Sequence, residues 1–418
     1  MGTRVECVAI LSPAVRILHV IHSVDPRGGG PIEGIKQLSA PMIAAGHRVE
    51  IMSLDQPGTP WDGAMPFHPI GRGRPGYGYA PGVVDWLVQH AKEYDVTLVN
   101  GLWQFGGLAV WRAARKTGQP YGVFTHGMLD PWFKRRYPLK HLKKWFYWPW
   151  GEYRVLRDAA AVFFTCEQER RDARESFWLY RCNEDVLGYG ITPPPDDAAA
   201  QLAAFHAKFP ELVGKRLLLF LGRMHEKKGC DMLLRAFART HDDLHLVMAG
   251  PCDDVFGQSL QRMSREPALA GRVTWTGMIQ GDLKWGAFRA AEAFVLPSHQ
   301  ENFGISVVEA LACDRPVLIS DKVNIWREIT ADGAGLIEDD TTDGTHRLLA
   351  RWLALGAGER QAVAACTRPV LRSTFRWRAL PGTCLNDFLI LNERSHGTLP
   401  AILLISLWFQ REESVMTA

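Results

Sequence analysis

The chain has 418 residues, with 48 Lys and Arg, 45 Asp and Glu, and a formal net charge of +3. A total so close to neutral does not require a nucleic-acid partner, so any electrostatic role must come from local clusters of charge. Hydrophobic residues make up 47% and charged residues 22% of the chain, which indicates a globular protein and excludes long disordered tracts. The length predicts two domains.

Cysteine usage and the two ends of the chain bear on its location. The eight cysteines show no C-x-x-C pair and no Cys/His spacing of a zinc site, which favours reduced thiols in the cytoplasm. The first apolar stretches are interrupted by Glu6, Pro13 and Arg16, unlike a signal peptide. Residues 399–409 are apolar but cover about half the length that spans a bilayer. We therefore expect a cytoplasmic protein without a transmembrane helix.

Short runs rich in β-branched and aromatic residues alternate with helical patterns in the first half of the chain. The predicted strands are residues 15–24, 47–54, 95–100, 121–126, 161–166 and 184–191. Helical patterns at 31–45 and 105–117 lie between some of them. Strands that alternate with helices predict a parallel α/β sheet with right-handed connections, so residues 1–191 are expected to form a Rossmann-like domain.

The same alternation begins again after a proline-rich segment. We interpret residues 192–205, which begin with TPPPDD, as a linker. The strands predicted beyond it are 216–222, 244–250, 272–277, 293–298, 315–320 and 334–337, with helices near 231–239, 282–291, 304–312 and 344–356. Residues 206–370 are therefore expected to form a second Rossmann-like domain, and the functional site is expected in the cleft between the two sheets. Residues 371–418 are expected to be a C-terminal segment that can cross back to the first domain and ends in a divergent tail.

A basic segment with glycines follows the first strand of the second domain. The stretch FLGRMHEKKGCDMLL presents Arg223 and Lys228 beside Gly222 and Gly229, and it opens a helix. Two cations, flexible glycines and a helix N-terminus suit a diphosphate. A solvated basic turn would contain the same residue types.

Two carboxylates flank a predicted strand-to-helix junction in HQENFGISVVEA. Glu301 is predicted in the loop at the carboxyl end of the strand, and Glu309 about a turn and a half into the helix, so both can face the cleft. The loop carboxylate can hold sugar hydroxyls, and the helical one can accept hydrogen bonds from a ribose diol. The backbone N–H groups of Phe303 and Gly304 are predicted at the helix start, where phosphate oxygens bind. A Glu stabilised by the helix dipole and an ordinary helical Glu would also explain the pattern.

The two segments together resemble a motif pair of one enzyme family. G-R-x4-K-G followed by P-S-x2-E-x7-E is similar to the pattern of retaining glycosyltransferases with the GT-B fold, in particular glycosyltransferase family 4, also called group 1. The resemblance implies two Rossmann-like domains whose parallel sheets face a central cleft. The donor-binding residues that it implies are Gly222, Arg223, Lys228, Glu301, Phe303, Gly304 and Glu309. Within this set, Glu301 is implied to lie near the transferred sugar, and Arg223 and Lys228 to act on the diphosphate.

Two segments of the first domain add to the resemblance. Gly28, Gly29 and Gly30 follow the first strand, where backbone can approach an anionic or polyhydroxylated ligand, although a plain turn fits equally. His126 ends another strand in FTHGMLDPW, a segment that resembles bacterial polysaccharide enzymes. The resemblance implies a catalytic role for His126 in orienting sugar or acceptor, whereas an isolated histidine is more often structural. Residues 163–169, FFTCEQE, resemble a segment that closes the cleft of the first domain.

Residues 131–154 form a basic cluster interleaved with aromatic side chains. Seven Lys and Arg accompany one acid, Glu152. The aromatic residues interleaved with them are Trp132, Phe133, Trp145, Phe146, Tyr147, Trp148 and Trp150. Cations and aromatic rings suit an anionic membrane surface, an acceptor or inter-domain surface, or single-stranded nucleic acid. The family resemblance disfavours nucleic acid, since many relatives add sugars to lipid-linked acceptors at the inner face of the plasma membrane.

The resemblance implies transfer of a sugar from a nucleoside diphosphate sugar to a hydroxyl of a carbohydrate or lipid-linked acceptor, with retention at the anomeric carbon. No metal and no further cofactor are expected, because the cations and the helix N-terminus can stabilise the leaving diphosphate. Exopolysaccharide, O-antigen or lipopolysaccharide biosynthesis is the expected context. Two alternatives remain open: a non-hydrolysing nucleotide-sugar epimerase, and a non-catalytic nucleotide-sugar-binding membrane scaffold.

Overall fold

The first half of the chain forms one sheet with flanking helices. The computed structural model describes residues 14–26, 30–61, 63–74, 76–187, 194–240 and 244–371. The strands of this half are β1 (Arg16–Ile21), β2 (Arg48–Ser53), β3 (Phe67–Pro69), β4 (Val96–Asn100), β5 (Tyr121–Phe124), β6 (Ala161–Phe164) and β7 (Glu184–Val186). The helices are α1 (Gly30–Ala44), α2 (Val83–His90), α3 (Phe105–Thr117), α4 (Trp132–Arg136), α5 (Pro138–Tyr147), α6 (Glu152–Arg157) and α7 (Glu167–Arg174).

The second half repeats this architecture. Its strands are β8 (Arg216–Leu221), β9 (Leu244–Ala249), β10 (Val273–Gly277), β11 (Ala293–Leu296), β12 (Val317–Ser320) and β13 (Gly335–Glu338). Its helices are α8 (Ala198–Lys208), α9 (Cys230–Phe237), α10 (Val255–Met263), α11 (Gly281–Ala290), α12 (Ile305–Ala312), α13 (Trp326–Ala331), α14 (Thr342–Ala354), α15 (Ala357–Ala365) and α16 (Thr367–Val370).

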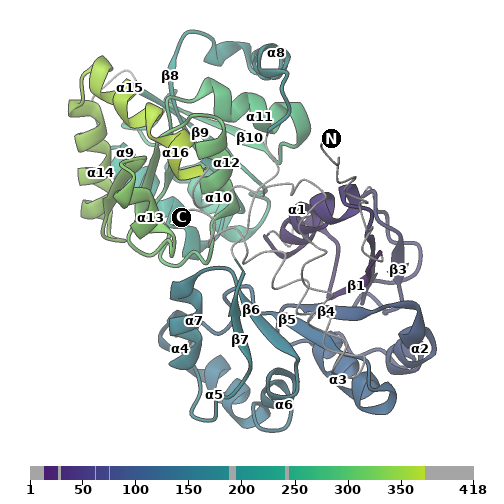
Figure 1. Cartoon of the computed structure of the whole chain (residues 1–418). Helices are drawn as coiled ribbons and strands as arrows, with labels where there is room; N and C mark the ends of the chain where they lie inside the picture. The colour runs from purple at the N-terminus through teal and green to yellow at the C-terminus, as the bar shows by residue number, and fades with distance from the viewer. Residues whose placement is uncertain are drawn as a thin grey trace, which may run out of the picture.

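Both sheets are parallel and doubly wound. The strand order is β3-β2-β1-β4-β5-β6-β7 in the first sheet and β10-β9-β8-β11-β12-β13 in the second, and the paired strands run parallel. Each sheet forms the centre of its own lobe (Figure 1). The predicted class, α/β with two Rossmann-like domains, is confirmed. In such sheets ligands bind outside the carboxyl ends of the strands, where the strand order reverses.

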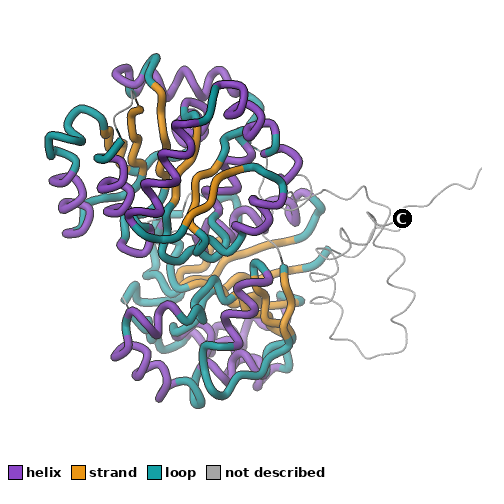
Figure 2. Tube along the Cα trace, turned by 90° about the vertical axis from the view of Figure 1, so that its left-hand side faces the viewer, coloured by secondary structure: helices purple, strands orange, loops and turns teal. Residues whose placement is uncertain are grey.

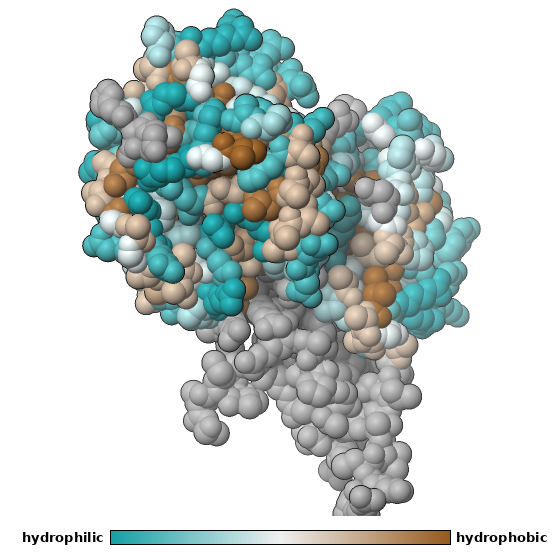
Figure 3. Space-filling model, turned by 90° about the horizontal axis from the view of Figure 1, so that it is seen from above, coloured by the Kyte–Doolittle hydropathy of each residue, from teal (hydrophilic) through white to brown (hydrophobic). Residues whose placement is uncertain are grey.

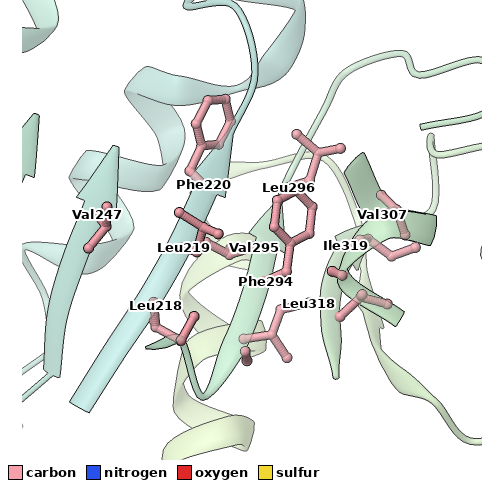
Figure 4. Packing of buried hydrophobic residues seen from close by; sticks show 14 of the residues in the cluster. Leu218, Leu219, Phe220, Val247, Phe294, Val295, Leu296, Val307, Leu318 and Ile319 are labelled. Atoms are coloured by element: carbon pink, nitrogen blue, oxygen red, sulfur yellow. The ribbon is translucent and has the colours of Figure 1, made fainter. Parts of the chain in front are cut away.

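Helices flank each sheet (Figure 2), so the central strands are mostly apolar and buried. In β4, VTLVN, all five residues are buried. In the second domain, side chains of β8, β9, β11 and β12 pack together with Val307 of α12 (Figure 4). The outer face seen in Figure 3 is largely hydrophilic, with hydrophobic residues in small groups. The rigid layers hold the loops at the strand ends in fixed positions.

The segment interpreted as a linker, residues 192–205, is partly helical. Helix α8 occupies residues 198–208 and packs against α11, with Gln201 and Phe205 buried. Asp197 caps the helix by accepting a hydrogen bond from the backbone N–H of Ala200 at 3.1 Å. The sequence AAAQLAAFHAK combines good helix formers with one buried face. Residues 188–193 lie outside the described residues.

Several predictions concern residues that the structure does not describe. Residues 1–13 and 372–418 are outside the described ranges, so the interpretations of the N-terminus, of residues 399–409 and of a crossing C-terminal helix stay predictions. Strand β7 ends at Val186, whereas the predicted strand was 184–191. Within the described ranges, no helix is both long and apolar enough to cross a membrane.

Close packing of α8 on α11 gives a test of the α8 assignment. A Cβ added at Gly286 would lie 2.1 Å from the carbonyl oxygen of Gln201, so Gly286→Ala forces the two helices apart. We expect this variant to lower the free energy of unfolding by about 1–3 kcal/mol. Gly358→Ala is the matched control, because it lies in helix α15 with open space around it and should be neutral or stabilising by up to about 1 kcal/mol. Chemical denaturation of both variants makes the comparison, and equal unfolding midpoints would contradict the packing.

Candidate functional site

The basic segment of the second domain is held against the end of a neighbouring strand. It leaves β8, forms a 3-10 turn at Glu226–Lys228 and enters α9. Gly229 has a φ of 65°, and a Cβ there would lie 2.2 Å from the carbonyl oxygen of Pro297, which follows β11. Only glycine allows this approach. The close contact brings Lys228 beside the loop that carries Glu301.

Lys228 and Glu301 form an ion pair at this point. The Nζ of Lys228 contacts Oε2 of Glu301, and the side chains are 21% and 13% exposed. Backbone contacts fix the Glu301 loop, since its N–H donates to the carbonyl of Lys322 at 3.0 Å and its carbonyl accepts from the N–H of Asn324 at 3.0 Å. The structure therefore brings together one residue from each of the two motifs.

Glu309 is paired with a lysine that the sequence analysis did not single out. The Nζ of Lys284 in α11 lies 2.8 Å from Oε1 of Glu309 in α12, and the Glu309 side chain is 4% exposed. Burial disfavours the charged form of Lys284, but the Glu309 carboxylate offsets this and raises the pKa of Lys284. Burial raises the pKa of Glu309, and the charge of Lys284 opposes that shift. Because this lysine comes from a separate βα unit, no local motif signals it.

The charges of the basic segment differ in their surroundings. Arg223 is exposed and has no ion pair within the described part of the chain. Withdrawal from water, with Lys227 and Arg223 nearby, lowers the pKa of Lys228 to about 7. Burial likewise lowers the pKa of Lys227 to about 8. Cations gathered without equal numbers of carboxylates make the segment a receptor for an anion.

The loop between Glu301 and α12 folds back on itself. Gly304 has a φ of 74° and forms the N-cap of α12. A Cβ added at Gly304 would lie 3.3 Å from Cγ of Glu301. Phe303 is 4% exposed and belongs to the core of the second domain. The buried ring anchors the loop, and the left-handed residue after it turns the chain into the helix.

His126 lies at the carboxyl end of β5 in the first domain. It has a φ of 49°, a conformation that non-glycine residues adopt rarely and mostly at functional positions. Its Nε2 lies 3.3 Å from Oδ1 of Asn100, whose Nδ2 lies 3.1 Å from Nδ1 of His19. Burial lowers the pKa of His126 to about 3, so the imidazole is neutral at physiological pH. It can therefore offer a hydrogen bond but not a charge.

Glu169 joins the two domains next to His126. Its carboxylate accepts hydrogen bonds from the Thr125 hydroxyl and the Gly127 N–H at 2.5 Å, and from the N–H and hydroxyl of Thr165 at 2.7 Å. A fifth donor, Nδ2 of Asn302, comes from the second domain at 2.9 Å. Since Asn302 follows Glu301 directly, one buried carboxylate ties the His126 turn to the loop of the second-domain motif. Sequence reasoning assigned Glu169 no chemistry, and Asn302 was not noticed.

The glycine triplet is only partly within the described residues. Gly28 and Gly29 lie outside them, and Gly30 is the first residue of α1. The negative charge of Glu33, in the first turn of α1, raises the pKa of both Lys284 and Glu309. The start of α1 therefore faces the Lys284–Glu309 pair.

The basic aromatic segment is more structured than its composition indicated. It forms α4, α5 and the start of α6. Trp148 is fully buried. Glu152, the single acid of the segment, is 1% exposed and accepts a hydrogen bond from the Trp103 N–H at 2.7 Å. These two residues are part of the core, which corrects the interpretation that the whole segment is a surface. Leu139 and Phe146 are exposed at 78% and 64%.

Both halves of the chain match models of glycosyltransferase families. Residues 29–190 match the model described as "Glycosyl transferase 4-like domain", and residues 203–365 match "Glycosyl transferases group 1". A similar curated protein is the D-inositol 3-phosphate glycosyltransferase of Mycolicibacterium smegmatis, 30% identical over 175 residues, which are 40% of this chain and 39% of that protein. The alpha-D-kanosaminyltransferase of Streptomyces kanamyceticus is 28% identical over 199 residues, 46% of this chain and 48% of that protein. The chain thus spans about half the length, or less, of these relatives.

Solved structures share the fold across both domains. Sucrose-phosphate synthase from Thermosynechococcus elongatus has a TM-score of 0.70 at 21% identity, covering 87% of this chain and 95% of that chain. HepE from Anabaena, solved in complex with UDP-glucose, has a TM-score of 0.69 at 16% identity, covering 86% and 95%. WaaG, a glycosyltransferase involved in lipopolysaccharide biosynthesis, has a TM-score of 0.66 at 15% identity, covering 85% and 95%. The protein has the GT-B fold. Its second domain matches the glycosyl transferases group 1, and its first matches the glycosyl transferase 4-like family.

The Glu169 junction gives a stability test. Glu169→Gln replaces one acceptor oxygen with an NH2 group that faces donors, so at least one buried donor loses its partner. We expect the free energy of unfolding to fall by about 1–3 kcal/mol. Glu167→Gln is the matched control on the same helix, because its pairs with Arg170 and Arg171 are partly exposed and should change stability by less than about 1 kcal/mol. Thermal and urea unfolding of both variants decide the point, and similar losses would argue against a special role for Glu169.

Proposed function

We propose that the protein is a retaining glycosyltransferase that transfers a sugar from a nucleoside diphosphate sugar to an acceptor hydroxyl. The observation that carries the proposal is the ion pair of Lys228 and Glu301 at the carboxyl end of the second sheet, with the charge of Arg223 nearby. They lie across from His126, joined to it through the Glu169–Asn302 junction. Cations for a diphosphate and a carboxylate for a sugar therefore adjoin a neutral imidazole in the opposite domain.

In the proposed reaction, the bond between the anomeric carbon and the diphosphate oxygen breaks and its electron pair stays on the diphosphate. Arg223 and Lys228 stabilise that growing charge. Glu301 holds hydroxyls of the transferred sugar, Glu309 accepts hydrogen bonds from the ribose, and Gly222, Phe303 and Gly304 supply backbone contacts to the donor. Retention requires the acceptor oxygen to bond to the same face of the anomeric carbon, with its proton passing to the leaving phosphate. His126 orients the sugar or the acceptor as a neutral hydrogen-bonding group.

Metal independence is part of the proposal, because the three cations Arg223, Lys227 and Lys228 can neutralise a diphosphate that carries two negative charges. The proposed context is exopolysaccharide, O-antigen or lipopolysaccharide biosynthesis, at the cytoplasmic face of the plasma membrane. It is supported by the HGMLDPW resemblance and by the similarity to WaaG, a glycosyltransferase involved in lipopolysaccharide biosynthesis. Similarity to HepE, solved with UDP-glucose, makes UDP-sugars the first donors to test.

The decisive assay is nucleotide release from UDP-, GDP- and ADP-sugars in the presence of EDTA, with a bacterial lipid extract as acceptor. We expect one donor to be consumed in an acceptor-dependent way, with kcat/KM at least about 100-fold lower in Arg223→Ala and Glu301→Ala. Lys208→Ala, on the exposed side of α8, is the control and should retain the wild-type rate. Donor binding without turnover would instead favour a non-catalytic scaffold. Proton NMR of the product tests retention.

Donor affinity should depend on pH through Lys228. Its pKa is lowered to about 7, so the lysine is charged below pH 7 and loses its charge as the pH rises. A bound diphosphate favours the charged form, so donor binding is strongest below pH 7 and should weaken about tenfold between pH 6 and pH 8. Lys228→Arg stays charged, so only Lys227, with a pKa of about 8, should still titrate, and the decrease between pH 6 and pH 8 should shrink to about twofold. Calorimetric titration with UDP-glucose measures both, and the same slope in the arginine variant would exclude Lys228 as its source.

We also propose that α5 and its flanks dock on an anionic membrane surface. Leu139, Phe146 and Trp150 are exposed at 78%, 64% and 70%, and Arg135 and Lys143 are exposed in the same segment. Exposed apolar side chains among cations suit the interfacial region of an anionic bilayer.

Vesicle binding tests this docking surface. The triple variant Leu139→Ser, Phe146→Ser, Trp150→Ser should bind phosphatidylglycerol vesicles at least about tenfold more weakly than the wild type. Val213→Ser with Val255→Ser is the control, since both valines are exposed apolar residues of the other domain and should have no effect. Equal vesicle binding by the triple variant and the wild type would refute membrane docking through this segment.

A further inference from the structure

The first domain contains a cavity that the proposed reaction has not yet used. It has a volume of about 60 Å³ and lies between the turn at residues 128–131, helices α4 and α5, and residues 176–177. Its walls are largely aromatic, with Trp103, Phe133, Tyr137 and Phe177. An apolar cavity with a few convergent polar groups is the usual form of a small-molecule site.

One wall of the cavity is a tryptophan held in an unusual conformation. Trp103 has a φ of 71°, which is rare for a bulky residue. Its backbone N–H donates to the buried carboxylate of Glu152 at 2.7 Å, and its indole Nε1 donates to the carbonyl of Met128 at 3.2 Å. The surrounding structure therefore fixes this ring, and strain of that kind occurs mostly at functional sites.

The polar groups of the cavity are mainly cationic. Lys134, Lys140 and Lys144 line it, and Asp130 is the single carboxylate in its lining. His141 also lines it, but burial and the charges of Lys134 and Lys144 lower its pKa and favour the neutral imidazole. That carboxylate already accepts a hydrogen bond from the N–H of Trp132 at 2.7 Å. The cavity therefore holds an excess of positive charge.

Lys144 is the most informative of these cations. Its Nζ lies 4.3 Å from the ring centroid of Trp103 and 5.6 Å from that of Phe133, and it forms no ion pair with any described residue. Burial lowers the pKa of Lys144 to about 8. The buried carboxylate of Glu152 attracts Lys144 without forming a direct ion pair, so the hydrogen-bond donors of its Nζ remain available to an anionic ligand.

The cavity borders the site described above. Its turn at 128–131 continues directly from His126 and Gly127, and a Cβ at Gly127 would lie 2.8 Å from Cβ of Asn302 in the second domain. From the other side, Nζ of Lys227 lies 5.5 Å from the ring centroid of Phe133. A molecule bound in the cavity is therefore a neighbour of both His126 and the basic segment.

We propose that this cavity binds a phosphate group of the acceptor, with Lys144 as its main cation and the aromatic walls holding the apolar or ring-bearing part next to it. The assignment to the acceptor rests on the proposed glycosyltransferase function. Two sources carry this chemistry, a lipid-linked phosphate and a soluble sugar phosphate.

Calorimetric titration with small phosphates tests the proposal without a donor. Geranyl phosphate and glucose 6-phosphate are the probes, with geraniol and glucose as uncharged partners. We expect at least one phosphate to bind, its uncharged partner not to bind, and Lys144→Met to weaken the phosphate about tenfold or more. Lys144→Arg should retain binding. Lys116→Met, an exposed lysine of α3 outside the cavity, is the matched control.

The outcomes distinguish a lipid-linked phosphate from a soluble sugar phosphate, and they show which results would overturn the proposal. Tighter binding of geranyl phosphate identifies a lipid-linked source, and tighter binding of glucose 6-phosphate a soluble one. Arg223→Ala should leave phosphate binding unchanged, because Arg223 belongs to the donor side. If Lys144→Met does not fold, Lys134→Met with Lys140→Met replaces it, since both lysines are exposed. Phosphates that bind no better than their uncharged partners, or that bind Lys144→Met like the wild type, overturn the proposal.

A titration with UDP-glucose on the same preparations keeps the two proposals apart. If the protein binds the phosphate but not UDP-glucose, the result would contradict the glycosyltransferase assignment and leave the cavity as a phosphate site. Donor turnover without phosphate binding would overturn the cavity proposal alone.

Discussion

The ion pair between Lys228 and Glu301 is the contact on which the second-domain site depends. It joins the turn after β8 to the loop after β11, two segments that are distant in the sequence but lie at neighbouring strands of one sheet. The pair can form because Gly229 lets the turn approach the carbonyl of Pro297. Removing one partner of a mostly buried ion pair leaves a charge without compensation, at a cost of about 3–5 kcal/mol. A second pair, Lys284 with Glu309, stabilises the adjoining helices in the same way.

The two ion pairs also hold their charged side chains in the positions that a ligand needs. A lysine already held beside a carboxylate requires little reorganisation when a diphosphate and a sugar arrive, and preorganised charges are the main source of electrostatic catalysis. The junction at Glu169 extends this order to the first domain, because five donors from both domains converge on one carboxylate. His126, Asn302 and Glu301 are thereby kept in one rigid neighbourhood. The phosphate cavity proposed behind the His126 turn would present an acceptor to this neighbourhood.

The sequence was sufficient for the architecture and for the residues that belong to local motifs. Continuous apolar strands and alternating helices led to two parallel sheets, and helix α3 was predicted with its observed bounds, because these patterns depend only on neighbouring residues. Lys284 and Asn302 were missed, since each acquires its importance from a partner in another βα unit. Composition misled twice. Glu152 and Trp148 looked like surface residues among lysines, and the alanine-rich helix α8 was hidden by the prolines before it.

The central claim is that the diphosphate of a sugar nucleotide lies between Arg223 and Lys228, with its sugar at Glu301. A crystal structure of the protein with UDP-glucose, grown in EDTA, tests it most directly. The account predicts diphosphate oxygens within hydrogen-bond distance of both cations, the ribose at Glu309, and Lys228 turned from Glu301 toward phosphate. A nucleotide bound away from these residues, or a diphosphate that contacts neither cation, would contradict it.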